Sequence, residues 1–157
     1  MAKTISPLRV GDQAPSFSVE DQKGNIRTLE EFKGSKLVLY FYPKDNTPGC
    51  TTQACNLNDN FAQLANEGYT ILGVSKDPAK SHLKFIEKFE LQFDLLCDED
   101  LSVHNAYGVW GLKKFMGREY DGTHRTTFVI DERGVLEQVI AKPKVKAHAE
   151  EILHPEG

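Results

Sequence analysis

A run of six consecutive apolar residues at positions 37–42 (Leu-Val-Leu-Tyr-Phe-Tyr) limits the fold of this chain more than any other feature. A continuous apolar run of this length, ended by Pro43, predicts a β-strand that is buried on both faces. A second strand of the same kind is predicted at residues 70–75. Strands buried on both faces need a layer of structure on each side, so the sequence predicts a sheet covered by helices.

The segment after the first strand has the spacing of a helix. Its apolar residues recur every three or four positions and are followed by a helix-ending glycine: Leu57, Phe61, Leu64, Ala65 and Gly68. A second helix is predicted over residues 77–89, with Asp77 as its N-cap and Pro78 at its first position. The order strand, helix, strand, helix is typical of an α/β fold.

The remaining segments complete this fold. A hairpin is predicted at residues 17–28, around a turn at residues 23–25. The other predicted elements are a loosely structured arm (1–15), a brief strand (95–97), a short helix (101–107), a C-terminal strand hairpin (126–130 and 135–141) and a final helix (144–153). Together they predict one domain over residues 1–157, an α/β sandwich whose central mixed sheet is flanked by helices.

The composition narrows the function classes. Nineteen basic and 23 acidic residues give a net charge of −4, and the densest basic stretch, residues 142–146, is short, so no nucleic-acid partner is expected. No apolar run approaches the roughly 20 residues that span a bilayer, and residues 1–11 lack the apolar core of a signal peptide. We therefore expect a cytoplasmic protein without a membrane partner, whose three cysteines form no disulfide scaffold.

The most unusual local sequence lies between the first buried strand and the following helix. In open α/β sheets, chemistry is found where strands end and helices begin. Pro43 and Pro48 stiffen this loop, and Gly49 permits either a close approach of another group to the backbone or a φ that other residues do not adopt. Cys50 then falls in the first turn of the helix, where its sulfur faces unpaired backbone N–H groups and the positive end of the helix dipole.

This position suits a nucleophilic thiol, because the thiolate is the nucleophile and a helix N-terminus stabilises it. Thr47 can direct its hydroxyl to the same place, and the backbone N–H groups of residues 49 and 50 can bind charge that develops on an oxygen. A lone cysteine at a strand–helix junction is more often a small buried apolar residue. The Pro, Thr, Gly and second Cys that accompany Cys50 favour the functional interpretation.

Cys55, five residues further along, is a candidate partner for Cys50. On a regular helix, five residues give a rise of ~7.5 Å and a rotation of ~140°, which separates the two Cα atoms by roughly 8–9 Å. A disulfide needs Cα atoms no more than about 7 Å apart. If the two cysteines pair, the first turns of the helix must therefore unwind. The alternative is that Cys55 is a packed, inert thiol.

Residues 41–55 resemble the active-site signature of the peroxiredoxins, and in particular of their bacterioferritin comigratory protein/PrxQ branch. The family pattern Pro-x-x-x-Thr/Ser-x-x-Cys is met by Pro43, Thr47 and Cys50, and the second cysteine of this branch is met by Cys55. The resemblance implies a thioredoxin-like fold. It also implies a thiol peroxidase that reduces hydrogen peroxide and organic hydroperoxides without a cofactor or metal.

The resemblance also implies roles for individual residues. Cys50 would be the peroxidatic cysteine, which becomes a sulfenic acid, and Cys55 the resolving cysteine, which forms an intrachain disulfide with it. Thioredoxin or a similar dithiol protein would reduce this disulfide again, and an intrachain pair makes a monomer the expected state. Family members also use an arginine from a distant strand, which matches Arg125 here; spacing alone does not distinguish Arg125 from Arg118 or Arg133.

Two departures limit what the resemblance implies. Position 53 is Gln where many relatives carry Glu, so a role that needs a charge at this position does not transfer. No cysteine follows Cys97, so a resolving cysteine from a C-terminal tail is not expected. Cys97 itself lies in an apolar stretch and is interpreted as a packing residue.

Other functions remain to be compared with a peroxidase. A metal site built from Cys50, Cys55 and His104 lacks the close ligand pairs that structural zinc sites use. Each of the five histidines is expected at the surface, and His124 draws attention only as the neighbour of Arg125. A disulfide reductase would carry Cys-x-x-Cys, which is absent. A peroxide-sensing protein needs the same two cysteines as a peroxidase, and only multiple turnover separates these two functions.

Overall fold

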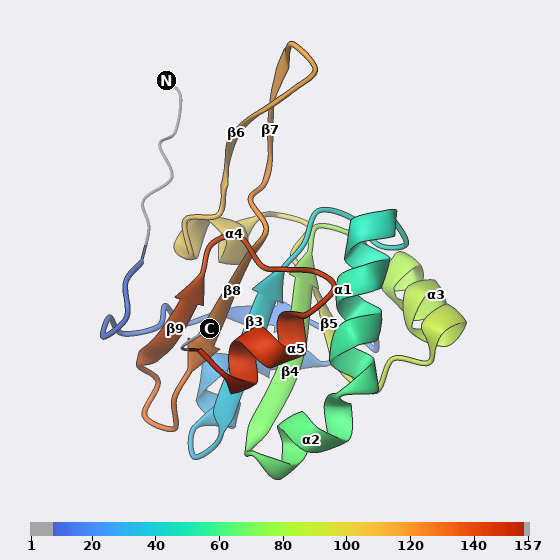
Figure 1. Ribbon diagram of the computed structural model, residues 1–157. Coiled ribbons are helices and arrows are strands. Elements are labelled where there is room, and N and C mark those ends of the chain that lie inside the picture. Colours follow the sequence, from blue (N-terminus) through green and yellow to red (C-terminus); the bar gives the residue numbers. More distant parts are fainter. Residues whose placement is uncertain (1–7, 156–157) are drawn as a thin grey trace.

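The computed structural model describes residues 8–155, and a five-stranded mixed sheet forms its centre (Figure 1). The strands run parallel from the edge to the middle and antiparallel beyond it. Their order is β5 (Asp94–Cys97), β4 (Tyr69–Ser75), β3 (Lys36–Phe41), β8 (Thr126–Ile130) and β9 (Leu136–Ile140). The predicted mixed sheet flanked by helices is confirmed. Part of the predicted N-terminal arm, residues 1–7, lies outside the described residues.

Strand β3 is buried on both faces, as its continuous apolar run predicts. Leu37, Leu39 and Phe41 belong to one apolar cluster, whereas Val38 and Tyr40 belong to the other. Alternate side chains of a strand point to opposite faces, so this single strand supplies both cores of the molecule.

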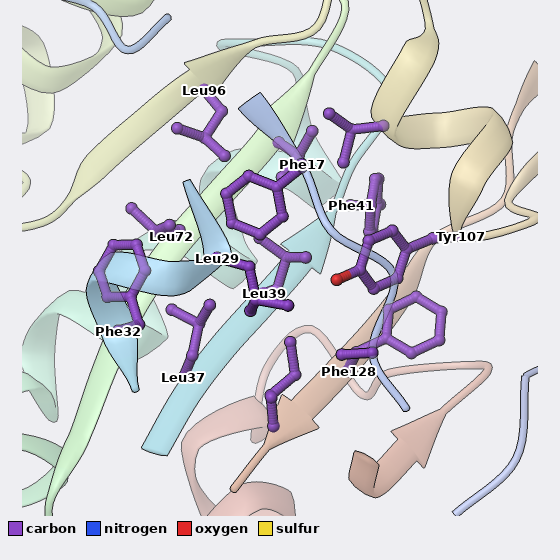
Figure 2. Packing of buried hydrophobic residues seen from close by; sticks show 14 of the residues in the cluster. Phe17, Leu29, Phe32, Leu37, Leu39, Phe41, Leu72, Leu96, Tyr107 and Phe128 are labelled. Carbon is purple, nitrogen blue, oxygen red and sulfur yellow. The ribbon is translucent and has the colours of Figure 1, made fainter. Parts of the chain in front are cut away.

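Four helices cover the face of Val38 and Tyr40. They are α1 (Pro48–Asp59), α2 (Phe61–Asn66), α3 (Ala79–Phe89) and α5 (His148–Leu153). The other face is covered by the hairpin of β1 (Ser18–Glu20) and β2 (Ile26–Thr28), the 3₁₀ helix η1 (Leu29–Phe32) and α4 (Ser102–Ala106). Figure 2 shows this second layer, in which Phe17, Phe32 and Tyr107 pack on the side chains of β3. Among the described residues, no helix is long and apolar enough to cross a membrane.

Three predicted helix boundaries are wrong. The long helix over residues 57–65 is two helices, because the Asn60 side chain donates to the carbonyl of Asn56 (2.8 Å) and competes with the regular helical bond. Helix α3 begins one residue later than predicted, with Pro78 at its N-cap; the Asp77 carboxylate instead accepts a hydrogen bond from Ser75 (2.7 Å). The last helix begins at His148 and not near residue 144.

One hairpin was not predicted at all. Strands β6 (Trp110–Phe115) and β7 (Arg118–Thr123) pair antiparallel and project from the end of the sheet (Figure 1). Their two-residue turn has positive φ at both Met116 (50°) and Gly117 (79°), which is the backbone of a type I′ turn. Because both faces of this hairpin are largely exposed, its sequence lacks the alternation that marks a half-buried strand.

Candidate active site

The pairing of β3 with β8 brings two distant segments to one edge of the sheet. Phe41, the last residue of β3, lies opposite Thr126, the first residue of β8. Because the two strands are antiparallel, the loop that leaves β3 and the residue before β8 emerge side by side. Arg125 is therefore held next to the loop that leads into α1.

Cys50 is the third residue of α1, in the first turn as predicted. Thr47 is the N-cap, with extended backbone, and its carbonyl accepts the first helical hydrogen bond from the N–H of Thr51 (2.8 Å). The side chain of Cys50 is only 1% exposed and packs in the helix-covered core with Tyr40 and Ala54. The sulfur thus lies in a buried site near the N-terminus of a helix, where unpaired backbone N–H groups and the positive end of the helix dipole face it.

Arg125 donates a hydrogen bond from Nη2 to the sulfur of Cys50, at 3.4 Å. This contact brings together the two residues that the resemblance pairs, although 75 positions separate them. Gly49 leaves room for this approach, because a Cβ at this position would lie 3.2 Å from the same Nη2, closer than an ordinary contact. Of the two possibilities predicted for Gly49, the structure shows the close backbone approach and not an unusual φ.

Gln53 holds the other side of the guanidinium. Its Oε1 accepts a hydrogen bond from Nη1 of Arg125 at 2.7 Å, and its side chain is fully buried one helical turn after Cys50. Among the described residues, its Nε2 has no hydrogen-bond partner. The sequence marked position 53 only as a departure from relatives. Its three-residue spacing from Cys50, which places both on one helix face, is the signal that could have indicated this role.

Lys113 is a second cation that the sequence did not indicate, because it lies in the unpredicted hairpin. Burial lowers the pKa of its amine, and the charge of Arg125 lowers it further. The Nζ atom donates to the carbonyl of Thr123 at 2.9 Å. The hairpin therefore brings a positive charge within electrostatic reach of the Arg125–Cys50 pair.

The structure places Thr47 and Pro43 in the loop but gives neither a direct contact with the sulfur. The Thr47 hydroxyl donates to the carbonyl of Lys44 at 2.8 Å, and the residue is half-buried. Pro43 follows Tyr42, whose N–H donates to the carbonyl of Val74 (3.0 Å) and extends the sheet into the loop. The role of the Thr47 hydroxyl in binding peroxide therefore stays a prediction.

All three cysteines are free. Cys55 is half-buried on α1, and burial, followed by the nearby Asp59 carboxylate, raises the pKa of its thiol. Cys97 is buried at the end of β5, where burial above all raises its pKa to about 12. A thiol with so high a pKa stays protonated at neutral pH, as suits the packing role predicted for Cys97.

The prediction of surface histidines is wrong for three of the five. His82, His104 and His148 are fully buried, and each forms a short hydrogen bond with a carboxylate: Asp45, Asp98 and Glu151. Asp45 and His82 are 37 positions apart, so no local pattern indicates this pair. His148 and Glu151, by contrast, have the three-residue spacing of neighbours on one helix face, a signal that could have indicated their contact. Within residues 8–155, the ligand atoms of Cys50, Cys55 and His104 do not gather at one point, which leaves the metal interpretation without support.

The fold and this site define the class of protein. The chain belongs to the AhpC/TSA family, because the sequence model of this family matches residues 10–139. It is 50% identical to the putative peroxiredoxin bcp of Haemophilus influenzae over 149 residues, which cover 95% of this chain and 96% of that protein. It is 46% identical to peroxiredoxin Bcp of Escherichia coli K12, with 96% of both chains covered. Among solved structures, PrxQ of Xylella fastidiosa superposes with a TM-score of 0.89 at 33% identity, covering 96% of each chain.

The branch within this family is also clear. The bacterioferritin comigratory protein of Xanthomonas campestris superposes with a TM-score of 0.83 at 36% identity, over 88% of each chain. The predicted peroxiredoxin of the bacterioferritin comigratory protein/PrxQ branch, with its thioredoxin-like fold and thiol peroxidase activity, is confirmed. Membership in this family implies a peroxide substrate and a thioredoxin-like reductant.

Proposed function

We propose that Cys50 is the cysteine that reacts with peroxide and that Arg125 and the first turn of α1 activate it. The observation that carries this proposal is the 3.4 Å hydrogen bond from Arg125 to the sulfur of Cys50. A guanidinium is permanently charged, so it stabilises a thiolate and can donate to a peroxide oxygen that approaches the sulfur. The N–H groups of residues 49 and 50 and the Thr47 hydroxyl lie in the same turn and are proposed to assist.

The first chemical step breaks the O–O bond of the peroxide. The thiolate of Cys50 attacks the terminal oxygen, a new S–O bond forms, and the remaining oxygen leaves with the electron pair. This leaving group takes up a proton and departs as water or alcohol, and Cys50 is left as a sulfenic acid. The sulfur of Cys50 supplies both electrons that reduce the peroxide. The related Xanthomonas campestris protein has alkyl peroxide reduction activity, which supports organic hydroperoxides as substrates besides hydrogen peroxide.

The second step joins the two cysteines of α1. The thiol of Cys55 attacks the sulfur of the sulfenic acid, water leaves, and an intrachain disulfide forms. Cys50 lies in the core and Cys55 on a half-buried face of the same helix, so the sulfur atoms meet only if Cys50 leaves the core. Unwinding of residues 50–55 is the movement that permits this.

Hydrogen exchange tests the unwinding directly. We expect the amides of residues 50–56 to exchange faster in the oxidised protein than in the reduced protein, because their helical hydrogen bonds are broken in the disulfide form. The amides of α3 serve as the internal control and should exchange equally in both forms. Equal protection of residues 50–56 in the two forms would exclude the unwinding.

Replacement of Cys55 with serine separates the two steps. We expect Cys55→Ser to consume one equivalent of peroxide and stop with Cys50 as sulfenic acid, or to consume a second equivalent where excess peroxide oxidises Cys50 further to sulfinic acid. The measurement is the intact mass of the protein after titration with peroxide, with trapping of the sulfenic acid by a dimedone-type reagent. Unimpaired cycling of this variant would show that another thiol resolves Cys50.

The last step of the cycle is reduction of the disulfide by a dithiol protein. Thioredoxin or a similar protein would reduce the Cys50–Cys55 disulfide by thiol–disulfide exchange. We also propose a monomer, because an intrachain disulfide needs no second subunit, and a cytoplasmic location, because the cycle needs a reducing compartment.

The proposal is tested first by counting free thiols before and after one equivalent of peroxide. Loss of two thiols, mapped by mass spectrometry to a Cys50–Cys55 bond within one chain, supports the two-cysteine cycle. Consumption of many equivalents of peroxide in the presence of thioredoxin then separates an enzyme from a peroxide sensor, which stops after one equivalent. Loss of the Cys50 thiol alone would mean a one-cysteine enzyme or a resolving thiol from outside the chain.

A further inference from the structure

The loop between β3 and α1 contains a buried carboxylate that the proposed chemistry does not use. The side chain of Asp45, five residues before Cys50, is 2% exposed. Its Oδ1 accepts a hydrogen bond from Tyr42 at 2.6 Å, and its Oδ2 accepts one from Ser81 at 2.8 Å. The next residue, Asn46, has a left-handed φ of 58°, a conformation that Asn adopts more readily than most residues.

Helix α3 supplies a further contact to Asp45 through His82. The fully buried imidazole approaches Oδ2 of Asp45 with its Nδ1, at 2.7 Å. Its Nε2 lies 2.8 Å from the backbone carbonyl of Leu96 in β5. The ring thus spans from the central sheet to the loop that leads into Cys50.

The two ring nitrogens of His82 have different partners. The Leu96 carbonyl can only accept, so Nε2 donates to it. Nδ1 and Oδ2 of Asp45 share a short hydrogen bond of 2.7 Å between two buried side chains. A hydrogen bond in so buried a position is costly to break, because the group that loses its partner is left unsatisfied.

We propose that His82 is a positioning residue for the peroxidase reaction, which acts through Asp45 to hold the loop and the first turn of α1 in the reactive geometry. Asp45 is fixed from its backbone as well, because its N–H donates to Asp77 at 2.9 Å. Loss of the His82 contact leaves a buried carboxylate with one donor fewer, and the loop then samples positions in which Arg125 and Cys50 are misaligned. The inference rests on Cys50 being the reacting cysteine.

Two substitutions at His82 separate its two contacts. His82→Asn keeps a side-chain N–H near the position of Nδ1, facing Asp45, whereas His82→Gln keeps one near the position of Nε2, facing Leu96. Each variant loses one buried hydrogen bond, so both should unfold at similarly lowered temperatures. We expect the second-order rate constant for Cys50 oxidation by hydrogen peroxide to fall about tenfold or more in His82→Gln and to stay within about threefold of wild type in His82→Asn.

His104 offers a matched control. It forms an equally buried pair with Asp98 (2.6 Å) but has no contact with residues 43–50 among the interactions that the structure describes. His104→Gln should therefore lower stability without a tenfold loss of oxidation rate. Equal rates in His82→Asn and His82→Gln, or a loss in His104→Gln as large as in His82→Gln, would overturn the inference, because the rate would then follow core stability alone.

If the His82 variants do not fold, Tyr42→Phe provides the test. It removes one donor to Asp45 while the ring still fills the core, and we expect oxidation of Cys50 to slow several-fold. An unchanged rate overturns the inference. A wild-type protein that does not react with peroxide at all would instead overturn the proposed function, so the two failures are distinguishable.

Discussion

Cys50→Ser is expected to abolish peroxide turnover, with a loss of at least ~10³-fold in the rate of peroxide consumption. The hydroxyl of serine is not ionised at neutral pH, and neither a helix N-terminus nor a guanidinium at 3.4 Å stabilises the alkoxide enough to replace a thiolate. The fold should be retained, because Cys and Ser are nearly equal in size. The measurement is consumption of hydrogen peroxide in the presence of thioredoxin, thioredoxin reductase and NADPH.

Cys97→Ala is the matched control for this experiment. Cys97 is also buried, but burial raises its pKa to about 12, and the charged groups that act on it in the described part of the chain are carboxylates, which raise the pKa further. We expect the variant to turn over at the wild-type rate. Activity that survives in Cys50→Ser, or disappears in Cys97→Ala, would show that the reacting cysteine has been assigned wrongly.

Arg125→Lys is expected to lower the second-order rate constant for Cys50 oxidation by ~10²-fold. Arg125 makes two hydrogen bonds with a planar fork, one to Gln53 (2.7 Å) and one to Cys50 (3.4 Å). A lysine ammonium is a point charge and cannot hold both partners in this geometry, so the substitution keeps the charge but loses its position. The measurement is the loss of the Cys50 thiol after rapid mixing with hydrogen peroxide.

Arg133→Lys controls for the loss of a guanidinium elsewhere. The side chain of Arg133 is 83% exposed and lies in the β8–β9 turn, so the rate should not change. Gln53→Leu tests the other partner: without its acceptor the guanidinium is less well fixed, and we expect a loss of about tenfold, smaller than in Arg125→Lys. A wild-type rate in Arg125→Lys would mean that positive charge alone is sufficient and that the fork geometry has no part in activation.

Much of the fold could be predicted because it depends on local rules. The continuous apolar runs indicated two strands with both faces buried, and the structure places alternate residues of β3 in two separate cores. The β6–β7 hairpin was missed for the opposite reason: its faces are exposed, so burial did not impose a pattern on its sequence. The break at Asn60 was missed because a side-chain hydrogen bond overrides an apolar periodicity that continues across it.

The sequence by itself determined that Cys50 lies in the first turn of a helix, after a loop that two prolines stiffen. It also placed Gly49, which has no side chain, directly before Cys50. These features lie within eight residues of one another, and short-range backbone geometry is sufficient to specify them. Tertiary structure alone decided which groups surround the sulfur. Arg125 reaches Cys50 through the register of β3 with β8, and His82 reaches Asp45 through the packing of α3 on the sheet. Contacts between residues 75 and 37 positions apart depend on how elements pair across the molecule, and no local pattern records that pairing.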